Sequence, residues 1–167
     1  MRRVYLVSTG GTIEKVYSEQ SGVVENRAAK LDRYLKLLRL PDCDIRTLQL
    51  MNKDSLEMTD ADRAEVKEQI GALLAEEAPI VISHGTDTMV ETGCYLQKAF
   101  PALKAPIVLT GAMTPLGFEG SDGLQNLTES LMATQFLQPG VYVVMHGQAI
   151  PVDHARKDKE RATFVRT

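Results

Sequence analysis

The feature that most restricts the fold of this sequence is a repeated alternation of short apolar runs with stretches of helical periodicity. The apolar runs, mostly rich in Val, Ile or Leu, cover residues 4–7, 45–51, 79–83, 105–110 and 140–145. Between them, apolar side chains recur at three- and four-residue intervals within 31–38, 66–74 and 124–131. Buried strands and amphipathic helices give these two patterns. The order predicts an α/β fold with three layers, in which helices cover both faces of a mostly parallel sheet.

Two helix starts carry capping signals. Thr59 with Asp62, and Thr88 with Glu91, each place a hydroxyl before a helix and a carboxylate three residues later. Such pairs satisfy free backbone N–H groups and complement the helix dipole. No internal repeat, low-complexity tract or linker divides the chain, so we expect residues 1–167 to form a single domain.

Composition argues against several classes of function. Nineteen Lys and Arg against 22 Asp and Glu leave a net charge of −3, so no basic field favours a nucleic acid or an anionic membrane. Cys43 and Cys94 lack CxxC spacing and are expected to be reduced packing thiols, with no disulfide framework or zinc site. The first apolar run is too short for a signal peptide, and no stretch approaches the ~20 apolar residues of a membrane span. We therefore expect a cytoplasmic protein with no nucleic-acid or membrane partner.

Polar, hydroxyl-rich segments follow four of the five expected strands. They cover residues 8–12, 53–55, 83–88 and 110–115. The carboxyl ends of parallel strands meet at one edge of a sheet, where loops converge and helix N-termini supply N–H donors. These four segments therefore mark the expected ligand-binding crevice.

The first segment, Ser-Thr-Gly-Gly-Thr, ends at Thr12. Paired glycines let the backbone approach a ligand without a Cβ in the way. The segment matches neither the GxGxxG dinucleotide fingerprint nor a phosphate-binding Walker loop. Taken alone, a Gly-Gly-Thr turn is more often a tight turn than a catalytic element.

The segment His-Gly-Thr-Asp-Thr places two hydroxyls and a carboxylate around one glycine at a strand-to-helix junction. Helix capping accounts for Thr88 but leaves Thr86 and Asp87 without a structural task. Asp87 could still be a turn residue that bonds the local backbone. We expect His84 to be a buried histidine bonded to a carbonyl rather than an acid or base. The residues alone leave function and turn chemistry both open.

Together with Thr-Gly-Ala-Met at 110–113 and a late lysine at 157, these motifs resemble the bacterial-type L-asparaginases in order and separation. The resemblance covers essentially the whole chain but only the N-terminal domain of the usual family member, as in a short form without the C-terminal domain. It implies a flavodoxin/Rossmann-like sheet. It also implies an amidohydrolase that converts L-asparagine to L-aspartate and ammonia, with no metal or cofactor.

The resemblance also assigns five catalytic positions. They are Thr12, Tyr17, Thr86, Asp87 and Lys157. Thr12 would attack the side-chain amide carbon and become acylated, and Tyr17 on the following loop would take its proton. The other three would position water or relay a proton.

Lys157 has a second interpretation, because it lies in a charge cluster at 156–161 that is typical of a solvated face or a frayed end. Lys159 is the neighbour that could take its place. Whether Tyr17 or a lysine is the base for Thr12 is left open.

Five positions are implied to bind substrate. They are Gly11, Asp54, Ser55, Asp87 and Ala112. Ser55 would bind the α-carboxylate and Asp87 the α-amino group, because hydroxyl donors suit a carboxylate and an aspartate suits an ammonium. The backbone carbonyl of Ala112 would accept from the substrate amide. Backbone N–H groups around Gly11 and Thr86 would stabilise the oxyanion.

Two other functions compete with asparagine hydrolysis. One is a non-catalytic module that binds an amino acid in the same crevice, and the other is a glutamine-using amidohydrolase domain that feeds ammonia to a transferase. The preference for asparagine over glutamine is left open. A small domain with its loops at one sheet edge gains closure from a partner, so we expect a homodimer or homotetramer.

Overall fold

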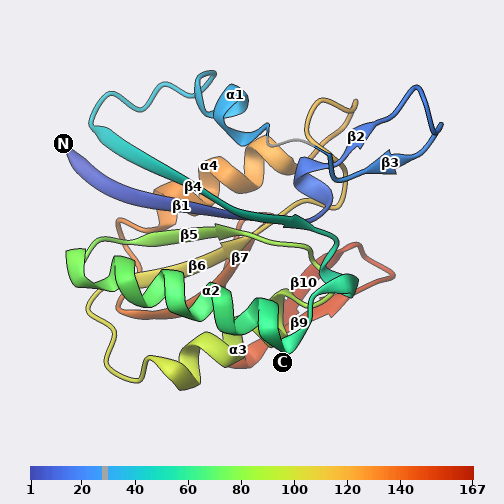
Figure 1. The fold of residues 1–167 in the computed structure, drawn as a ribbon. Helices are drawn as coiled ribbons and strands as arrows, with labels where there is room; N and C mark the ends of the chain where they lie inside the picture. The colour runs from blue at the N-terminus through green and yellow to red at the C-terminus, as the bar shows by residue number, and fades with distance from the viewer. Residues whose placement is uncertain (28–29) are drawn as a thin grey trace.

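The structure is a computed structural model that describes residues 1–27 and 30–167. A six-stranded sheet with the order β4-β1-β5-β6-β7-β8 forms its centre (Figure 1). Its strands are β1 (Arg2–Gly10), β4 (Cys43–Lys53), β5 (Ile80–Ser83), β6 (Pro106–Thr110), β7 (Gly140–Met145) and β8 (Gln148–Pro151). Two hairpins lie outside it: β2 (Val16–Tyr17) with β3 (Val24–Glu25), and β9 (Ala155–Asp158) with β10 (Thr163–Arg166).

Neighbouring strands of the sheet run parallel except for the antiparallel pair β7 and β8. The order of the five parallel strands is that of flavodoxin-like proteins, and the direction of winding reverses between β1 and β5. A ligand crevice is expected at this reversal, beyond the carboxyl ends of the strands. The predicted α/β class and mostly parallel sheet are confirmed.

Helices cover both faces of the sheet (Figure 1). They are α1 (Leu31–Leu35), α2 (Asp60–Leu73), α3 (Met89–Ala99) and α4 (Gly123–Ala133). One apolar cluster joins α2 and α3 to one face, and a second joins α1 and α4 to the other.

Successive side chains along a strand point to opposite faces of the sheet, so each strand contributes to both clusters. On β5, Ile80 and Ile82 belong to the cluster under α2 and α3, and Val81 belongs to the opposite one. All three side chains are fully buried. Burying a side chain of this size contributes about 1.5–3 kcal/mol, so these runs hold the sheet between its two helical layers.

Most of the predicted elements are present, with altered bounds. The helix expected at 31–38 ends at Leu35. The backbone N–H groups of Leu37 and Leu38 bond three residues back rather than four, so the chain continues in tighter turns. The final charge cluster is not a frayed end, because it belongs to the β9–β10 hairpin, where most of its side chains are exposed.

One capping prediction is confirmed and the other is wrong. The Thr59 hydroxyl accepts from the Asp62 N–H, and the Asp62 carboxylate accepts from the Thr59 N–H, so the capping box is complete. Thr88 occupies the N-cap of α3, but its hydroxyl makes no capping bond. It donates instead to the backbone oxygen of Ser55 at 2.9 Å. A tertiary hydrogen bond, in which the hydroxyl donates, takes the place of the local cap, in which it would accept.

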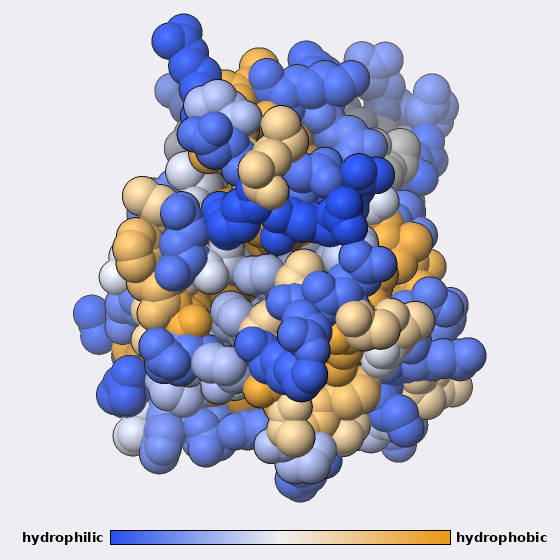
Figure 2. Space-filling view, turned by 90° about the vertical axis from the view of Figure 1, so that its left-hand side faces the viewer, coloured by the Kyte–Doolittle hydropathy of each residue, from blue (hydrophilic) through white to orange (hydrophobic). Residues whose placement is uncertain are grey.

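The amino-end face of the sheet lies opposite the predicted crevice. Figure 2 shows this face as a mixture of hydrophilic and smaller hydrophobic areas. A hollow of ≈ 370 Å³ lies between the end of α2 and the loop after α3, and Leu74, Phe100 and Leu103 contribute to its lining.

None of the helices in the described residues is long and apolar enough to cross a membrane.

Candidate active site

The turn that carries Thr12 packs directly against the turn after β5. Gly11 has a φ of 79° and leads into a 3₁₀ turn at Thr12–Glu14. A Cβ on Gly11 would lie 2.4 Å from the backbone nitrogen of Gly85, closer than any real side chain allows. Both the conformation and the contact therefore require glycine at this position. The close approach places Thr12 beside the His-Gly-Thr-Asp-Thr segment, at the reversal between β1 and β5.

Gly85 also contacts the polar segment at 53–55. A Cβ on Gly85 would lie 2.5 Å from the Ser55 Cβ and Oγ, so Ser55 fills the space that a side chain would take. The Ser55 side chain is buried, and its hydroxyl has no hydrogen-bond partner within the described part of the chain. An unpaired buried hydroxyl costs free energy, which a ligand that bonds it would recover.

Lys157 reaches the same place from the end of the chain. Its ammonium group donates to the Thr86 hydroxyl at 2.7 Å and to the Asp87 carboxylate at 2.9 Å. The β9–β10 hairpin carries Lys157, and Phe164, its partner across the hairpin, is fully buried in the core. Lys159 on the same hairpin is exposed. Of the two lysines that the sequence offered, Lys157 is the one placed against the Thr86–Asp87 pair.

The Thr-Gly-Ala-Met segment forms the remaining wall. Gly111 lies beside Thr86, since a Cβ at Gly111 would be 3.5 Å from the Thr86 methyl carbon. The Gly111 carbonyl accepts from Asn126, and the Met113 N–H donates to Asp122. Ala112, between them, is fully buried, and the hydrogen bonds of its two neighbours hold its backbone from both sides.

Some predicted residues are placed differently. Tyr17 lies on the β2–β3 hairpin with 58% of its surface exposed, and no hydrogen bond joins it to Thr12 among the described residues. The Gly11 N–H already donates to the Lys53 carbonyl at 2.8 Å, so it is not available as an oxyanion donor. Asp54 is occupied as well, because its carboxylate accepts from the Lys15 ammonium at 2.5 Å and from the Leu56 N–H.

Burial and ion pairing set the charges around the site. Burial lowers the pKa of His84 to about 4, so its ring is neutral at pH 7. Its Nδ1 lies 2.8 Å from the Gly85 carbonyl and its Nε2 lies 2.8 Å from the Thr92 hydroxyl, which confirms the expected structural role. The hydrogen bond from Lys15 holds the pKa of Asp54 below its ordinary value. Burial raises the pKa of Glu14, which lies two residues after Thr12 and bonds the Ser8 hydroxyl.

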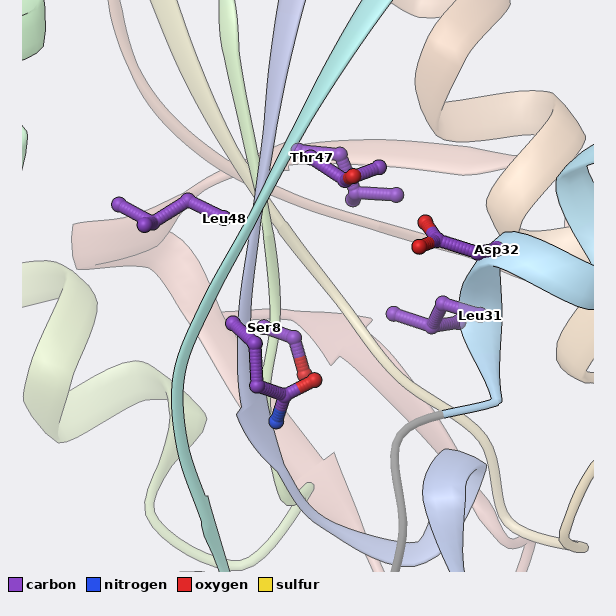
Figure 3. Close-up of a pocket in the computed structure, with 7 residues that line it drawn as sticks. Ser8, Leu31, Asp32, Thr47 and Leu48 are labelled. Carbon is purple, nitrogen blue, oxygen red and sulfur yellow. The ribbon is translucent and has the colours of Figure 1, made fainter.

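Two hollows lie near the carboxyl edge. One of ≈ 320 Å³ separates the β2–β3 hairpin from the 3₁₀ turn that begins at Ser55, and Lys15, Asn26 and Asp54 help to line it. The other, of ≈ 250 Å³, lies between α1 and the strands β1 and β4. Figure 3 shows Leu31 and Asp32 facing Ser8 and Thr47 across it. Its lining contains none of the predicted site residues, so only the first hollow adjoins the site.

Sequence reasoning missed two residues that hold the turn at Thr12. Lys15 ties the turn to Asp54, and the Asn26 amide donates to the Gly11 carbonyl at 2.9 Å. Both lie in the polar loop around the β2–β3 hairpin, where no periodicity distinguishes them from solvated residues.

Among residues 1–27 and 30–167, no group of three His, Cys, Asp or Glu residues is placed to hold a metal ion.

Fold and site together define an α/β protein in which hydroxyl-bearing residues gather at the winding reversal, where a lysine from a distant hairpin meets a Thr-Asp pair. Known proteins share this fold. The family model described as asparaginase, N-terminal, matches residues 3–164. The chain therefore belongs to the asparaginase family.

Individual relatives agree with this assignment. The structure of the thermostable L-asparaginase from Thermococcus kodakarensis superimposes with a TM-score of 0.84 at 26% identity, covering 98% of this chain and 51% of that one. L-asparaginase 1 from Escherichia coli K12 is 33% identical over 135 residues, which are 78% of this chain and 39% of that protein. A glutamyl-tRNA(Gln) amidotransferase subunit from Methanococcus vannielii is 31% identical over 150 residues, which are 89% of this chain and 35% of that protein. The chain thus spans about half the length of the relatives it matches, or less.

Proposed function

We propose that this protein hydrolyses L-asparagine to L-aspartate and ammonia through an ester formed on Thr12. The observation that carries the proposal is the contact of the Lys157 ammonium with Thr86 and Asp87, next to the glycine contact that fixes the Thr12 turn. A protein that only bound an amino acid would need the carboxylate and hydroxyl ligands but would have no use for a partly buried lysine-threonine pair. Family membership supports the same reaction class.

The chemistry proceeds in two acyl transfers. The Thr12 oxygen attacks the side-chain amide carbon of asparagine, its proton passes to a neighbouring base, and the carbon–nitrogen bond breaks as the leaving nitrogen gains a proton to become ammonia. Water then attacks the β-aspartyl ester, which releases aspartate and restores the Thr12 hydroxyl. We assign the activation of this water to the Thr86–Asp87–Lys157 set, because an adjacent ammonium stabilises alkoxide character at Thr86.

Tyr17 remains our candidate for the base that takes the Thr12 proton. Its exposed position on a short two-stranded hairpin means that the hairpin must fold towards the Thr12 turn when substrate binds. Such closure is common in enzymes that exclude water from a reacting centre. Lys15, three residues after Thr12, is the alternative base, but its bond to Asp54 would first have to break.

We assign substrate recognition to three groups at the site, of which the Asp87 carboxylate also accepts from Lys157. The buried Ser55 hydroxyl, which has no partner among the described residues, is suited to the α-carboxylate, and the Asp87 carboxylate to the α-amino group. The Ala112 carbonyl would accept from the substrate amide. Because the Gly11 N–H is occupied, we assign the oxyanion to the N–H groups of Thr12 and Thr86. We place Asp54 in a supporting role, as the partner of Lys15.

Glutamine use is the second candidate, favoured by the likeness to a tRNA-dependent amidotransferase. The two substrates differ by one methylene, which a pocket discriminates by about 1–3 kcal/mol.

We also propose a homodimer or homotetramer, in which a partner covers the open side of the crevice. Light scattering at micromolar concentration tests this, and a monomer would contradict it.

Ammonia release from asparagine and from glutamine, measured on the purified chain, tests the function directly. We expect turnover of asparagine that Thr12→Ala abolishes. Thr128→Val, which alters an exposed threonine on α4, should retain it. No ammonia at millimolar asparagine would contradict the proposal, and faster release from glutamine would favour the second candidate. Calorimetric binding of asparagine without turnover would indicate an amino-acid-binding module.

A further inference from the structure

Asp122, just before α4, collects hydrogen bonds from the loop that contains Ala112. Its carboxylate accepts from the backbone N–H groups of Met113 and Thr114 at 3.0 Å each and from the Asn126 amide at 2.9 Å. The Asp122 side chain is only 16% exposed. A buried carboxylate with this many donors is rigid, and so are the peptide groups that donate to it.

These bonds determine the direction of the Ala112 carbonyl. The Ala112 carbonyl and the Met113 N–H belong to one peptide group, and the chain contains no cis peptide in its described part. In a trans peptide the C=O and N–H bonds point in opposite directions. Because the Met113 N–H points at Asp122, the Ala112 carbonyl must point away from it. The bond from Asn126 to the Gly111 carbonyl fixes the preceding peptide in the same way.

His146 connects this carboxylate to another part of the molecule. Its Nε2 lies 2.7 Å from Asp122, and its Nδ1 lies 2.8 Å from the Thr163 hydroxyl. A carboxylate only accepts, so Nε2 carries a hydrogen and donates it. His146 occupies the turn between β7 and β8 with a φ of 52°, and its N–H is held by the Asn126 side chain at 3.0 Å. The ring is therefore fixed at its backbone and at both nitrogens.

The second contact of the ring, with Thr163, joins it to the hairpin that carries Lys157. Thr163 begins β10 and pairs with Asp158 on β9, and the next pair in the hairpin is Phe164 with Lys157. A single imidazole ring thus bridges Asp122, which orients the Ala112 carbonyl, and the hairpin that delivers the Lys157 ammonium to Thr86.

We propose that His146 is a positioning residue that holds the Ala112 loop and the Lys157 hairpin in register through Asp122 and Thr163. The Asp-His-Thr order resembles a nucleophilic triad, but the described structure gives this cluster a different task. Asp122 is saturated by backbone and amide donors that belong to the Ala112 loop and α4, and Thr163 sits within a hairpin ladder. The inference rests on the proposed function for its catalytic consequence only, because the linkage itself is geometric.

The test compares His146→Leu with His146→Gln. Both side chains lack the tolerance of histidine for a positive φ, so backbone strain is common to the pair. Glutamine offers an NH₂ group that donates and an oxygen that accepts, whereas leucine offers neither. Leucine should lower kcat/KM for asparagine by about 100-fold, the loss expected when a reacting group shifts by about 1 Å. Glutamine should restore most of it. His154→Leu, at an exposed histidine, is the matched control and should behave as the wild type.

Thr163→Val distinguishes the two contacts of the His146 ring, one with Thr163 and the other with Asp122. It breaks the contact with the Lys157 hairpin and leaves Asp122 in place, so we expect a lower kcat with little change in KM. His146→Leu breaks both contacts and should change both constants. Because the two substitutions interrupt one path, the double variant should be no slower than His146→Leu alone. Additive losses, or a leucine variant with wild-type kinetics, would overturn the inference.

Amide hydrogen exchange of Met113 and Thr114 separates this inference from the proposed function. Both amides should exchange slowly in the wild type and faster in His146→Leu, whether or not the protein hydrolyses asparagine. If the wild type releases no ammonia, the function fails while the linkage stands on its exchange data. Unchanged exchange in the leucine variant would overturn the linkage itself.

Discussion

The ammonium group of Lys157 lies 2.7 Å from the hydroxyl of Thr86, although 71 positions separate the two residues in the chain. The contact depends on the β9–β10 hairpin, whose buried Phe164 anchors it to the apolar core. It converts a lysine within a charge cluster into part of a partly buried polar site.

Lys157→Met should remove the ammonium that stabilises alkoxide character at Thr86. We expect kcat/KM for asparagine to fall by about 10²–10⁴-fold, the usual contribution of a proton-transfer group. Lys159→Met is the control, because Lys159 is exposed on the same hairpin, and it should keep wild-type rates. Equal losses in the two variants would mean that general charge near the site, rather than the Thr86 contact, is responsible.

Ser55→Ala should separate substrate binding from stability. The hydroxyl is buried without a described partner, so its removal should leave the free energy of unfolding unchanged or raise it. Loss of a hydrogen bond to the substrate carboxylate should raise KM by about 10–100-fold, since such bonds contribute about 1.5–3 kcal/mol. Ser83→Ala removes another buried hydroxyl that has no partner in the described structure and to which we assign no substrate contact, and it should leave KM unchanged. A marked loss of stability in Ser55→Ala would show that the hydroxyl serves the fold.

Gly11→Ala should destabilise the protein more than a left-handed backbone alone explains. Gly22 has a similar φ of 70° but open space around it, so Gly22→Ala carries only the conformational cost of about 1–2 kcal/mol. At Gly11 the new methyl group would also collide with the Gly85 backbone at 2.4 Å. Urea unfolding of both variants measures the difference. Equal losses would mean that the two turns are not in close contact.

Glu14 should make stability depend on pH. Burial raises its pKa above the ordinary value of 4.5, so the folded protein favours the protonated form more than the unfolded chain does. The contribution of Glu14 to stability is therefore fully present below about pH 4.5 and is lost as the pH rises through the higher folded value.

Glu14→Gln removes this dependence. The wild type should lose stability relative to the variant as the pH increases from 4 to 8, with a slope of at most about 1.4 kcal/mol per pH unit within the titration range. Urea unfolding at several pH values measures the slope, and Glu19→Gln, at an exposed position, is the control. A constant difference between wild type and variant would contradict the raised pKa, and an opposite slope would show that the folded state favours the carboxylate.

Much of the fold could be predicted because its local signals agree with its tertiary structure. The five apolar runs became the five parallel strands. The inner strands β5 and β6 are buried along their whole length, and a strand buried on both faces is apolar throughout. The strand β8 and the β9–β10 hairpin were not predicted. Their residues alternate irregularly, and tertiary contacts such as the burial of Phe164 stabilise them.

In the site as well, some residues could be predicted from local signals, whereas others depend on tertiary contacts. Thr12, Ser55 and Thr86 follow strands, so topology alone brings them to one edge of the sheet. Thr88 was misassigned as a cap because its acceptor is the distant Ser55 carbonyl. The role of His146 depends on contacts with residues 24 positions before it and 17 after it, which no local pattern encodes.

The most direct measurement of the central claim is the site of acylation. The protein would be treated with an electrophilic analogue of asparagine, digested, and mapped by mass spectrometry. The account predicts one added mass on the peptide that contains Thr12, and no label in Thr12→Ala. A label on another residue, such as Thr86, or no label in a protein that hydrolyses asparagine, would contradict it.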